Sequence, residues 1–107
     1  MASRVGDTDT IRRLLGDPLM PERTVKIVNK LGLHARPAAE IVKTAARFKS
    51  DITIIRDDLE VNGKSIMGVM MIAAEFGSTI LLRAEGVDAD GALDALAALV
   101  AAKFGES

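Results

Sequence analysis

The sequence predicts a small α+β domain with two layers, in which one β-sheet is covered on one face by helices. A chain of 107 residues has room for one hydrophobic core. Its 49% apolar and 27% charged residues are typical of a folded protein. The apolar spacing changes between a strand period and a helix period, in the order strand, helix, strand, strand, helix, strand, helix. Two helical crossovers around one short hairpin favour this architecture.

Residues 1–21 form an N-terminal extension that differs from the domain expected over residues 22–107. Asp9 or Thr10 is placed to cap a short helix whose apolar residues follow at helical spacing, namely Ile11, Leu14 and Leu15. Prolines at positions 18 and 21 end this pattern. One or two helical turns are marginal alone, so the extension either docks on the domain or frays.

The first half of the domain contains a strand and the clearest helix. Residues 24–28 alternate polar and apolar side chains, which indicates a strand. After a loop with Gly32, a helix is expected over residues 35–48. Its apolar face carries Ala38, Ile41, Val42, Ala45 and Phe48. Its opposite face carries Arg36, Glu40, Lys43 and Arg47. We interpret that face as solvated, with Lys43 and Arg47 as candidates for contacting an acidic partner.

The second half begins with a hairpin. Residues 52–56 and 59–62 are expected to be strands, joined by two aspartates that favour a turn. Ser65 then stands at the N-cap of a helix expected over residues 66–76, with Gly77 as its stop.

Residues 79–85 predict a fourth strand. Asp88 is expected to cap the last helix, and Gly105 to end it. The buried stripe of this helix is Leu93, Leu96, Val100 and Phe104.

Composition excludes several classes of function. The formal net charge is −1, so no basic excess indicates nucleic acid or an acidic membrane as a partner. Cysteine is absent, which excludes disulfides and thiolate nucleophiles, and a single histidine disfavours a zinc site. We therefore expect no metal and no cofactor. No apolar run reaches the roughly 18 residues that cross a bilayer, and the N-terminus does not read as a secretory signal. The cytoplasm is the default location.

The single histidine stands between the first strand and the first helix, in the segment GLHARPA at residues 32–38. We expect His34 at the N-cap and Pro37 in the first turn, where proline is tolerated because the N–H groups there have no acceptor within the helix. These free N–H groups and the positive end of the helix dipole attract anions. Arg36 adds a charge whose planar donors suit phosphoryl oxygens, and Gly32 permits a tight preceding turn.

Imidazole is a good nucleophile near neutral pH, and its two ring nitrogens can take different roles. One can be held by a hydrogen bond while the other attacks phosphorus, and the developing negative charge would meet the helix start and Arg36. The ordinary interpretation of a lone histidine is a loop residue that happens to cap a helix. A lone arginine is most often a solvated charge. The whole segment, rather than either residue, favours phosphoryl chemistry at His34.

The segment at residues 32–38 resembles the active-site signature of the HPr family, the histidine phosphocarriers of the bacterial phosphoenolpyruvate-dependent phosphotransferase system. Residues 61–70, VNGKSIMGVM, resemble the family's second signature, which surrounds a regulatory serine. Residues 85–89 resemble its usual entry to the last helix. The resemblance spans about residues 23–104 with all elements in order, and the extension before the first strand departs from it.

The resemblance implies an open-faced β-sandwich, with a four-stranded antiparallel sheet covered on one face by three helices. It implies that His34 takes a phosphoryl group from phosphorylated enzyme I and gives it to enzyme IIA domains in sugar uptake, with Arg36 assisting. Ser65 would be the target of HPr kinase/phosphorylase. The protein would be a carrier acted on by partner enzymes, not an enzyme itself, and we expect a monomer.

The helix after Ser65 carries more apolar residues than a thin domain can bury, namely Ile66, Met67, Val69, Met70, Met71 and Ile72. Such residues usually belong to a core. Part of this helix should nevertheless form an exposed patch for partner proteins, and we assign Ile66, Met67 and Met70 to it. Ser65 itself is first a helix cap, and its regulatory role follows from the resemblance alone.

Three other functions are compared with the carrier. A regulatory protein of a nitrogen-related phosphotransferase branch, read through its phosphorylation state, is the main alternative. An independent enzyme with His34 as a general base lacks a second histidine, a cysteine or a carboxylate partner in the motif. A nucleic-acid binder is disfavoured because the only aromatic residues are three phenylalanines and basic residues are not in excess.

Overall fold

The computed structural model describes residues 20–106. The short helix expected around residues 9–15 therefore lies outside the described residues. Within them, the elements follow one another in the expected order: β1 (Glu22–Lys26), α2 (Ala35–Ala45), β2 (Asp51–Arg56), β3 (Leu59–Asn62), α3 (Ile66–Ile72), β4 (Thr79–Glu85), α4 (Ala89–Ala101) and a final 3₁₀ turn, η1 (Lys103–Gly105).

The four strands form one antiparallel sheet in the order β1-β4-β2-β3. Only β2 and β3 are joined as a hairpin. Because β1 and β2 both run antiparallel to β4, they are parallel to each other, and α2 connects them across the strand between. Helix α3 connects β3 to β4 in the same way, across β2. Both crossovers thus leave their helices over the sheet.

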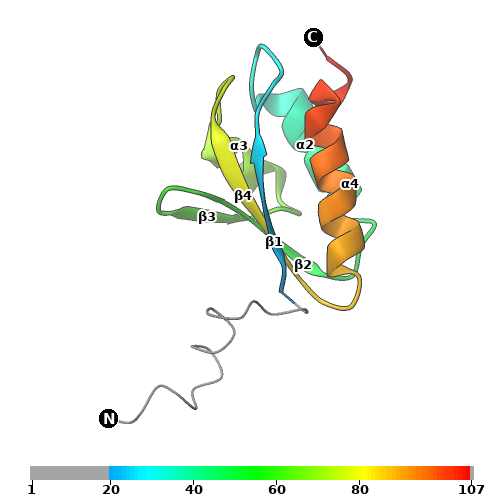
Figure 1. The fold of residues 1–107 in the computed structure, drawn as a ribbon. Coiled ribbons are helices and arrows are strands. Elements are labelled where there is room, and N and C mark those ends of the chain that lie inside the picture. The colour runs from blue at the N-terminus through cyan, green and yellow to red at the C-terminus, as the bar shows by residue number, and fades with distance from the viewer. Residues whose placement is uncertain (1–19, 107) are drawn as a thin grey trace, which may run out of the picture.

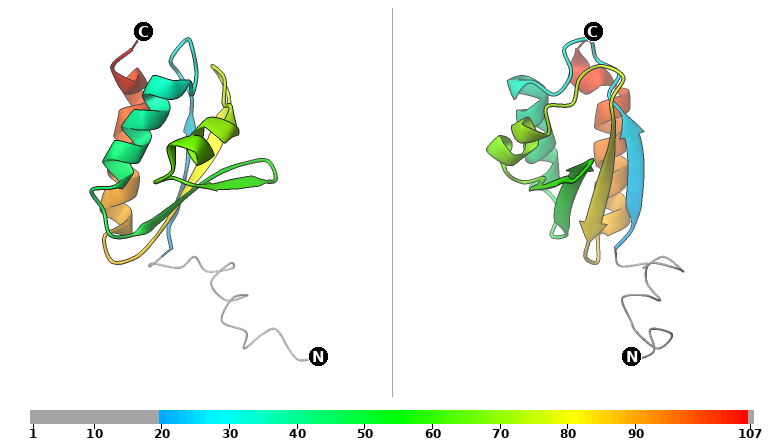
Figure 2. Two further views of the ribbon diagram at one scale, coloured as in Figure 1. Left: turned by 180° about the vertical axis from the view of Figure 1, so that it is seen from behind. Right: turned by 90° about the vertical axis from the view of Figure 1, so that its left-hand side faces the viewer.

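Within residues 20–106, the three α-helices lie on one face of the sheet, and none of them covers the opposite face (Figure 1, Figure 2). The strands send their buried side chains to the covered face, including Ile52, Ile54, Ile80, Leu82 and Ala84. The helices meet them with Ala38, Ile41, Val69, Ile72, Leu93, Leu96 and Val100. On the uncovered face Arg83 pairs with Glu22 at 2.8 Å and with Glu60 at 3.8 Å. The fold is therefore the open-faced α+β sandwich that the resemblance implies.

Two helices end earlier than the apolar pattern predicts. Helix α2 was expected to reach residue 48, but after Ala45 the N–H groups of Arg47 and Phe48 bond to carbonyls three residues back, which tightens the chain into a turn. Helix α3 was expected to reach residue 76 with Gly77 as its stop. It ends at Ile72 because Ala73 adopts a left-handed conformation and Arg56 Nη1 donates to the carbonyls of the last turn.

Asp88 occupies the N-cap of α4, but its side chain does not cap that helix. The carboxylate instead accepts hydrogen bonds from Lys49 N at 2.8 Å, from Ser50 N at 2.9 Å and from Ser50 Oγ. These bonds, led by that of the Ser50 hydroxyl, lower the pKa of Asp88 to about 2. The prediction of a local cap was wrong because the loop between α2 and β2 offers unpaired donors to the same carboxylate.

The other boundaries need smaller corrections. Strand β1 begins at Glu22 rather than residue 24 and ends at Lys26, because Ile27 bonds to the turn at Gly77 and Ser78. Phe104 is buried as expected but lies in η1, after α4 has ended at Ala101. Lys103 and Phe104 both have positive φ angles, so the chain turns back here. This turn brings Glu106 to the loop between β1 and α2, where it contacts Asn29.

Candidate functional site

The loop between β1 and α2 is held in one shape by Gly32. Its φ is 69°, and a Cβ at this position would lie 2.5 Å from the carbonyl oxygen of Ala74. The next residue, Leu33, donates its N–H to that same oxygen at 2.8 Å and buries its side chain. Only glycine therefore fits both the left-handed turn and the close approach of the two loops. This packing fixes where α2 begins.

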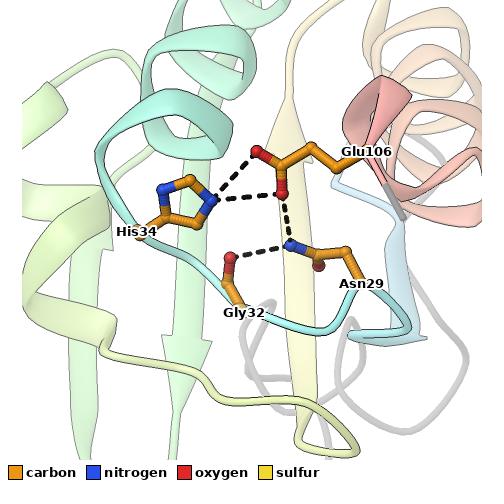
Figure 3. Close-up of polar contacts among 4 residues, drawn as sticks. All are labelled: Asn29, Gly32, His34 and Glu106. Atoms are coloured by element: carbon orange, nitrogen blue, oxygen red, sulfur yellow. Dashed lines mark hydrogen bonds and ion pairs between the residues drawn. The ribbon is translucent and has the colours of Figure 1, made fainter.

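His34 occupies the N-cap of α2, as the sequence predicts. Its backbone is extended and its carbonyl accepts the first helical hydrogen bond, from Ala38 N at 3.0 Å. Its side chain makes no capping bond and faces the C-terminal segment instead. There Nε2 lies 2.9 Å and 3.1 Å from the two carboxylate oxygens of Glu106 (Figure 3). The other ring nitrogen, Nδ1, lies on the side of the ring away from this carboxylate (Figure 3).

Glu106 is in turn held by Asn29, which is fully buried. Asn29 Nδ2 donates both to Glu106 Oε1 at 3.0 Å and to the carbonyl oxygen of Gly32 at 2.9 Å (Figure 3). The bond to His34 is the main cause that lowers the pKa of the Glu106 carboxyl, followed by the bond to Asn29 and the nearby charges of His34 and Arg36, while partial burial opposes them. The carboxylate is therefore ionised at neutral pH.

Sequence reasoning missed both Asn29 and Glu106. They are 77 residues apart, and Glu106 reaches the site only because of the two left-handed residues in η1. No spacing rule connects them to His34. The one available signal was the polar Asn29 directly after a strand, which is weak because asparagine is common in loops.

The start of α2 adds positive charge and free donors near His34. The N–H groups of Ala35 and Arg36 precede the first helical bond and have no acceptor within the helix. Pro37 is buried and needs no acceptor. Arg36 is exposed and forms no ion pair with another described residue, so its guanidinium is available to a bound anion.

Together these groups can hold an anion at the helix start while the imidazole acts as a nucleophile. If Nε2 carries the proton that Glu106 accepts, the lone pair of the ring is on Nδ1, on the side away from this carboxylate (Figure 3). Among residues 20–106, no cluster of three or more histidine or acidic side chains could hold a metal ion. No helix in the same range is long and apolar enough to cross a membrane.

The chain is similar to known proteins over most of its length. Residues 21–102 match the family described as the PTS HPr component phosphorylation site. The chain is 49% identical over 87 residues to the phosphocarrier protein HPr of Cupriavidus necator, covering 81% of this chain and 98% of that protein. The crystal structure of HPr from Thermoanaerobacter tengcongensis superposes with a TM-score of 0.78 at 48% identity, covering 81% of this chain and 98% of that chain.

The chain belongs to the HPr family. It is a phosphocarrier component of the phosphotransferase system. One relative carries another name: the phosphocarrier protein NPr of Shewanella violacea is 46% identical over 86 residues, covering 80% of this chain and 94% of that protein.

The second HPr signature lies at the start of α3. Ser65 caps this helix, since its Oγ accepts a hydrogen bond from Gly68 N at 3.1 Å. Lys64 next to it is tied down by a bond from Nζ to the carbonyl of Phe48 at 2.8 Å. The capping role predicted for Ser65 is thus confirmed. The bond of Lys64 joins the residues before α3 to the turn that follows α2.

The apolar residues assigned to a partner surface are exposed. Ile66, Met67 and Met70 are 46%, 77% and 43% accessible, whereas Val69 and Ile72 of the same helix are buried. Five further large apolar residues that the sequence analysis did not assign to this surface are exposed, namely Leu31, Leu59, Met71, Phe76 and Val87. The two loops that carry Leu31 and Phe76 are in contact, because residue 33 bonds to residue 74.

Lys43 and Arg47 lie on the exposed side of α2 and of the turn after it. The Nζ atom of Lys43 is 3.6 Å from Oε2 of Glu40. The guanidinium carbon of Arg47 lies 5.9 Å from the centre of the Phe48 ring. Both cations remain in contact with solvent, as expected for a charged face that is open to a partner.

Proposed function

We propose that Nδ1 of His34 accepts a phosphoryl group from phosphorylated enzyme I and passes it to enzyme IIA domains in sugar uptake. The observation that carries this proposal is the bond between Nε2 and the Glu106 carboxylate, which leaves Nδ1 as the free nucleophile at a helix start. In each transfer a P–N bond forms at Nδ1 as the bond between phosphorus and the donor breaks. The ring keeps the proton on Nε2, and Glu106 offsets the positive charge that the ring gains.

The phosphoryl oxygens are best held by the free N–H groups of Ala35 and Arg36 and by the Arg36 side chain. These groups act as an electrostatic template, and the protein remains a substrate of its partners rather than an enzyme with a turnover of its own. The partners are proposed to dock on Ile66, Met67 and Met70, with Lys43 and Arg47 contacting acidic side chains.

Incubation with enzyme I and labelled phosphoenolpyruvate tests the proposal. Label should enter the wild-type protein in a form that is acid-labile and base-stable, and it should be lost in His34→Ala. Persistent labelling of that variant would place the acceptor elsewhere.

The similarity to an NPr protein supports a second function, as a regulatory component of a nitrogen-related branch without direct sugar transport. The two functions differ in which enzyme I donates the phosphoryl group to this protein. Purified enzyme I of the sugar branch and that of the nitrogen-related branch should be compared at equal concentration, and the faster donor decides between them.

We also propose that Ser65 is a site of regulatory phosphorylation by an HPr kinase/phosphorylase. Its position at the first turn of α3, beside the exposed apolar residues, supports an effect of phosphate on docking.

A further inference from the structure

Helix α3 exposes three thioethers on one surface. Met67, Met70 and Met71 are 77%, 43% and 62% accessible. The chain has five methionines in all, and Met20, the other one within the described residues, is only half-exposed. Met67 and Met71 are four residues apart, so they share one face of the helix, opposite the side that faces the core. Methionine is usually a core residue, and this concentration at the surface is unusual.

Helix α3 is attached to the rest of the domain by other side chains than these methionines. Val69 and Ile72 anchor the helix in the core, at 0% and 3% accessibility. Ser65 caps its first turn, and Arg56 donates to the carbonyl oxygens of Ile72 and Ala73 at its end. A chemical change at Met67, Met70 or Met71 should therefore alter the surface of the helix without unfolding it.

Exposed thioethers react with peroxides. The sulfur lone pair attacks one oxygen of hydrogen peroxide, so that an S–O bond forms and the O–O bond breaks. The oxygen bound to sulfur loses its proton, and the departing hydroxide takes up a proton and leaves as water. The thioether is oxidised by two electrons and hydrogen peroxide is reduced. The product, methionine sulfoxide, is polar and is reduced back by methionine sulfoxide reductases. Accessible methionines should react first, because the peroxide must reach the sulfur.

We propose that Met67, Met70 and Met71 form a peroxide-sensitive modification site that switches off docking to phosphoryl-transfer partners. This rests on the proposed function, in which α3 is part of the partner surface. A sulfoxide oxygen is well solvated in the free protein. In a complex it would face an apolar partner surface and lose its water without gaining a donor, which weakens binding. Oxidation thus lowers the rate of phosphoryl transfer to His34, while the site around Glu106 stays intact.

Three full-length proteins test the proposal: wild type, the triple variant Met67→Leu/Met70→Leu/Met71→Leu, and the control Met20→Leu. Leucine keeps the apolar surface but cannot be oxidised in this way. Each protein is treated with hydrogen peroxide, and peptide mapping by mass spectrometry gives the oxidation of each methionine. The initial rate of labelling by enzyme I is measured before and after treatment, and again after repair by the reductases.

Met67, Met70 and Met71 should be oxidised before Met20. Labelling of the wild type and of Met20→Leu should then slow about tenfold, as expected for a polar group desolvated without a partner, and return after repair. The triple variant should be labelled after treatment at the rate that it has before treatment. Oxidation of Met20 ahead of the three methionines of α3 would overturn the site, and an equal loss of rate in the triple variant would overturn the switch. If untreated protein takes no label at all, the proposed function fails, and the peptide map still decides the oxidation site.

Discussion

The proposed chemistry of this protein depends on the contact between His34 and Glu106. A carboxylate on Nε2 favours the tautomer with a free Nδ1, and it would stabilise the positive charge of a phosphorylated ring. The amide of the buried Asn29 holds this carboxylate in place.

Glu106→Gln should slow the labelling of His34 about tenfold, since the amide keeps the shape of the side chain but not its charge. Nitrogen NMR of the unphosphorylated imidazole should show protonated Nε2 in the wild type and a mixture of tautomers in the variant. Glu60→Gln, on the uncovered face of the sheet, is the matched control. An unchanged tautomer ratio in Glu106→Gln would contradict the positioning role.

Arg36 should matter through both charge and geometry. Arg36→Lys keeps the charge but loses the planar pair of donors, so transfer should slow several-fold while the melting temperature is unchanged. Arg36→Ala should be slower still, by about tenfold or more relative to wild type. If Arg36→Ala transfers at the wild-type rate, the N–H groups of the helix start suffice alone.

At the scale of elements, short helices depend on single side chains at their ends. Helix α3 has seven residues, and Ser65 and Arg56 bind its two ends. A phosphate on Ser65 would sit near the positive end of α3, so the fold should tolerate it. It would add about −1.5 to −2 charges at pH 7 beside the apolar residues of the partner surface.

Phosphorylation of Ser65, or less reliably Ser65→Asp, should therefore weaken docking to enzyme I and slow the labelling of His34. The melting temperature should barely fall. Ser65→Ala is the control, because it removes the cap at a cost of about 1 kcal/mol without adding charge. A large drop in melting temperature with normal transfer kinetics would show that Ser65 is a structural cap only.

Asp88 fastens the start of α4 to the loop before β2, and this contact should make stability depend on pH. Its pKa in the folded protein is about 2, below the ordinary 3.8. The contribution is therefore complete above about pH 4 and is lost as the pH falls through about 2. Urea unfolding measured between pH 2 and pH 6 should show this loss in wild type and in Asp90→Asn, but less of it in Asp88→Asn. If the free energy of unfolding falls equally with pH in all three proteins, Asp88 is not the group responsible for the loss.

At the scale of the whole molecule, the fold places two distant segments at one end of the sheet. The loop after β1 and the C-terminal turn meet there, with the start of α2 between them (Figure 2). Residues 20–106 contain every group of the proposed site. Deleting residues 1–19 should thus leave labelling by enzyme I within about threefold of the full chain, a difference of less than 1 kcal/mol. Loss of labelling in a truncated protein with an unchanged circular dichroism spectrum would assign a role to the extension.

The order of the elements and the place of His34 could be predicted because both depend on local patterns. Period, caps and the glycine at position 32 act within a few residues. The contacts of Asp88 and Glu106 could not be predicted from the sequence. Each carboxylate binds a segment that is distant in the sequence and that only tertiary packing places beside it. The sequence predicts α2 and α3 to be longer than they are, for a related reason. Apolar residues continue past the point where the backbone leaves the helix.

Nitrogen NMR of the protein after phosphorylation by enzyme I, with the histidine ring labelled with ¹⁵N, identifies the acceptor atom directly. Phosphorus is expected on Nδ1 of His34, with a proton retained on Nε2 in contact with Glu106. Phosphorus on Nε2, or an unmodified ring in a protein that carries label, would contradict this expectation.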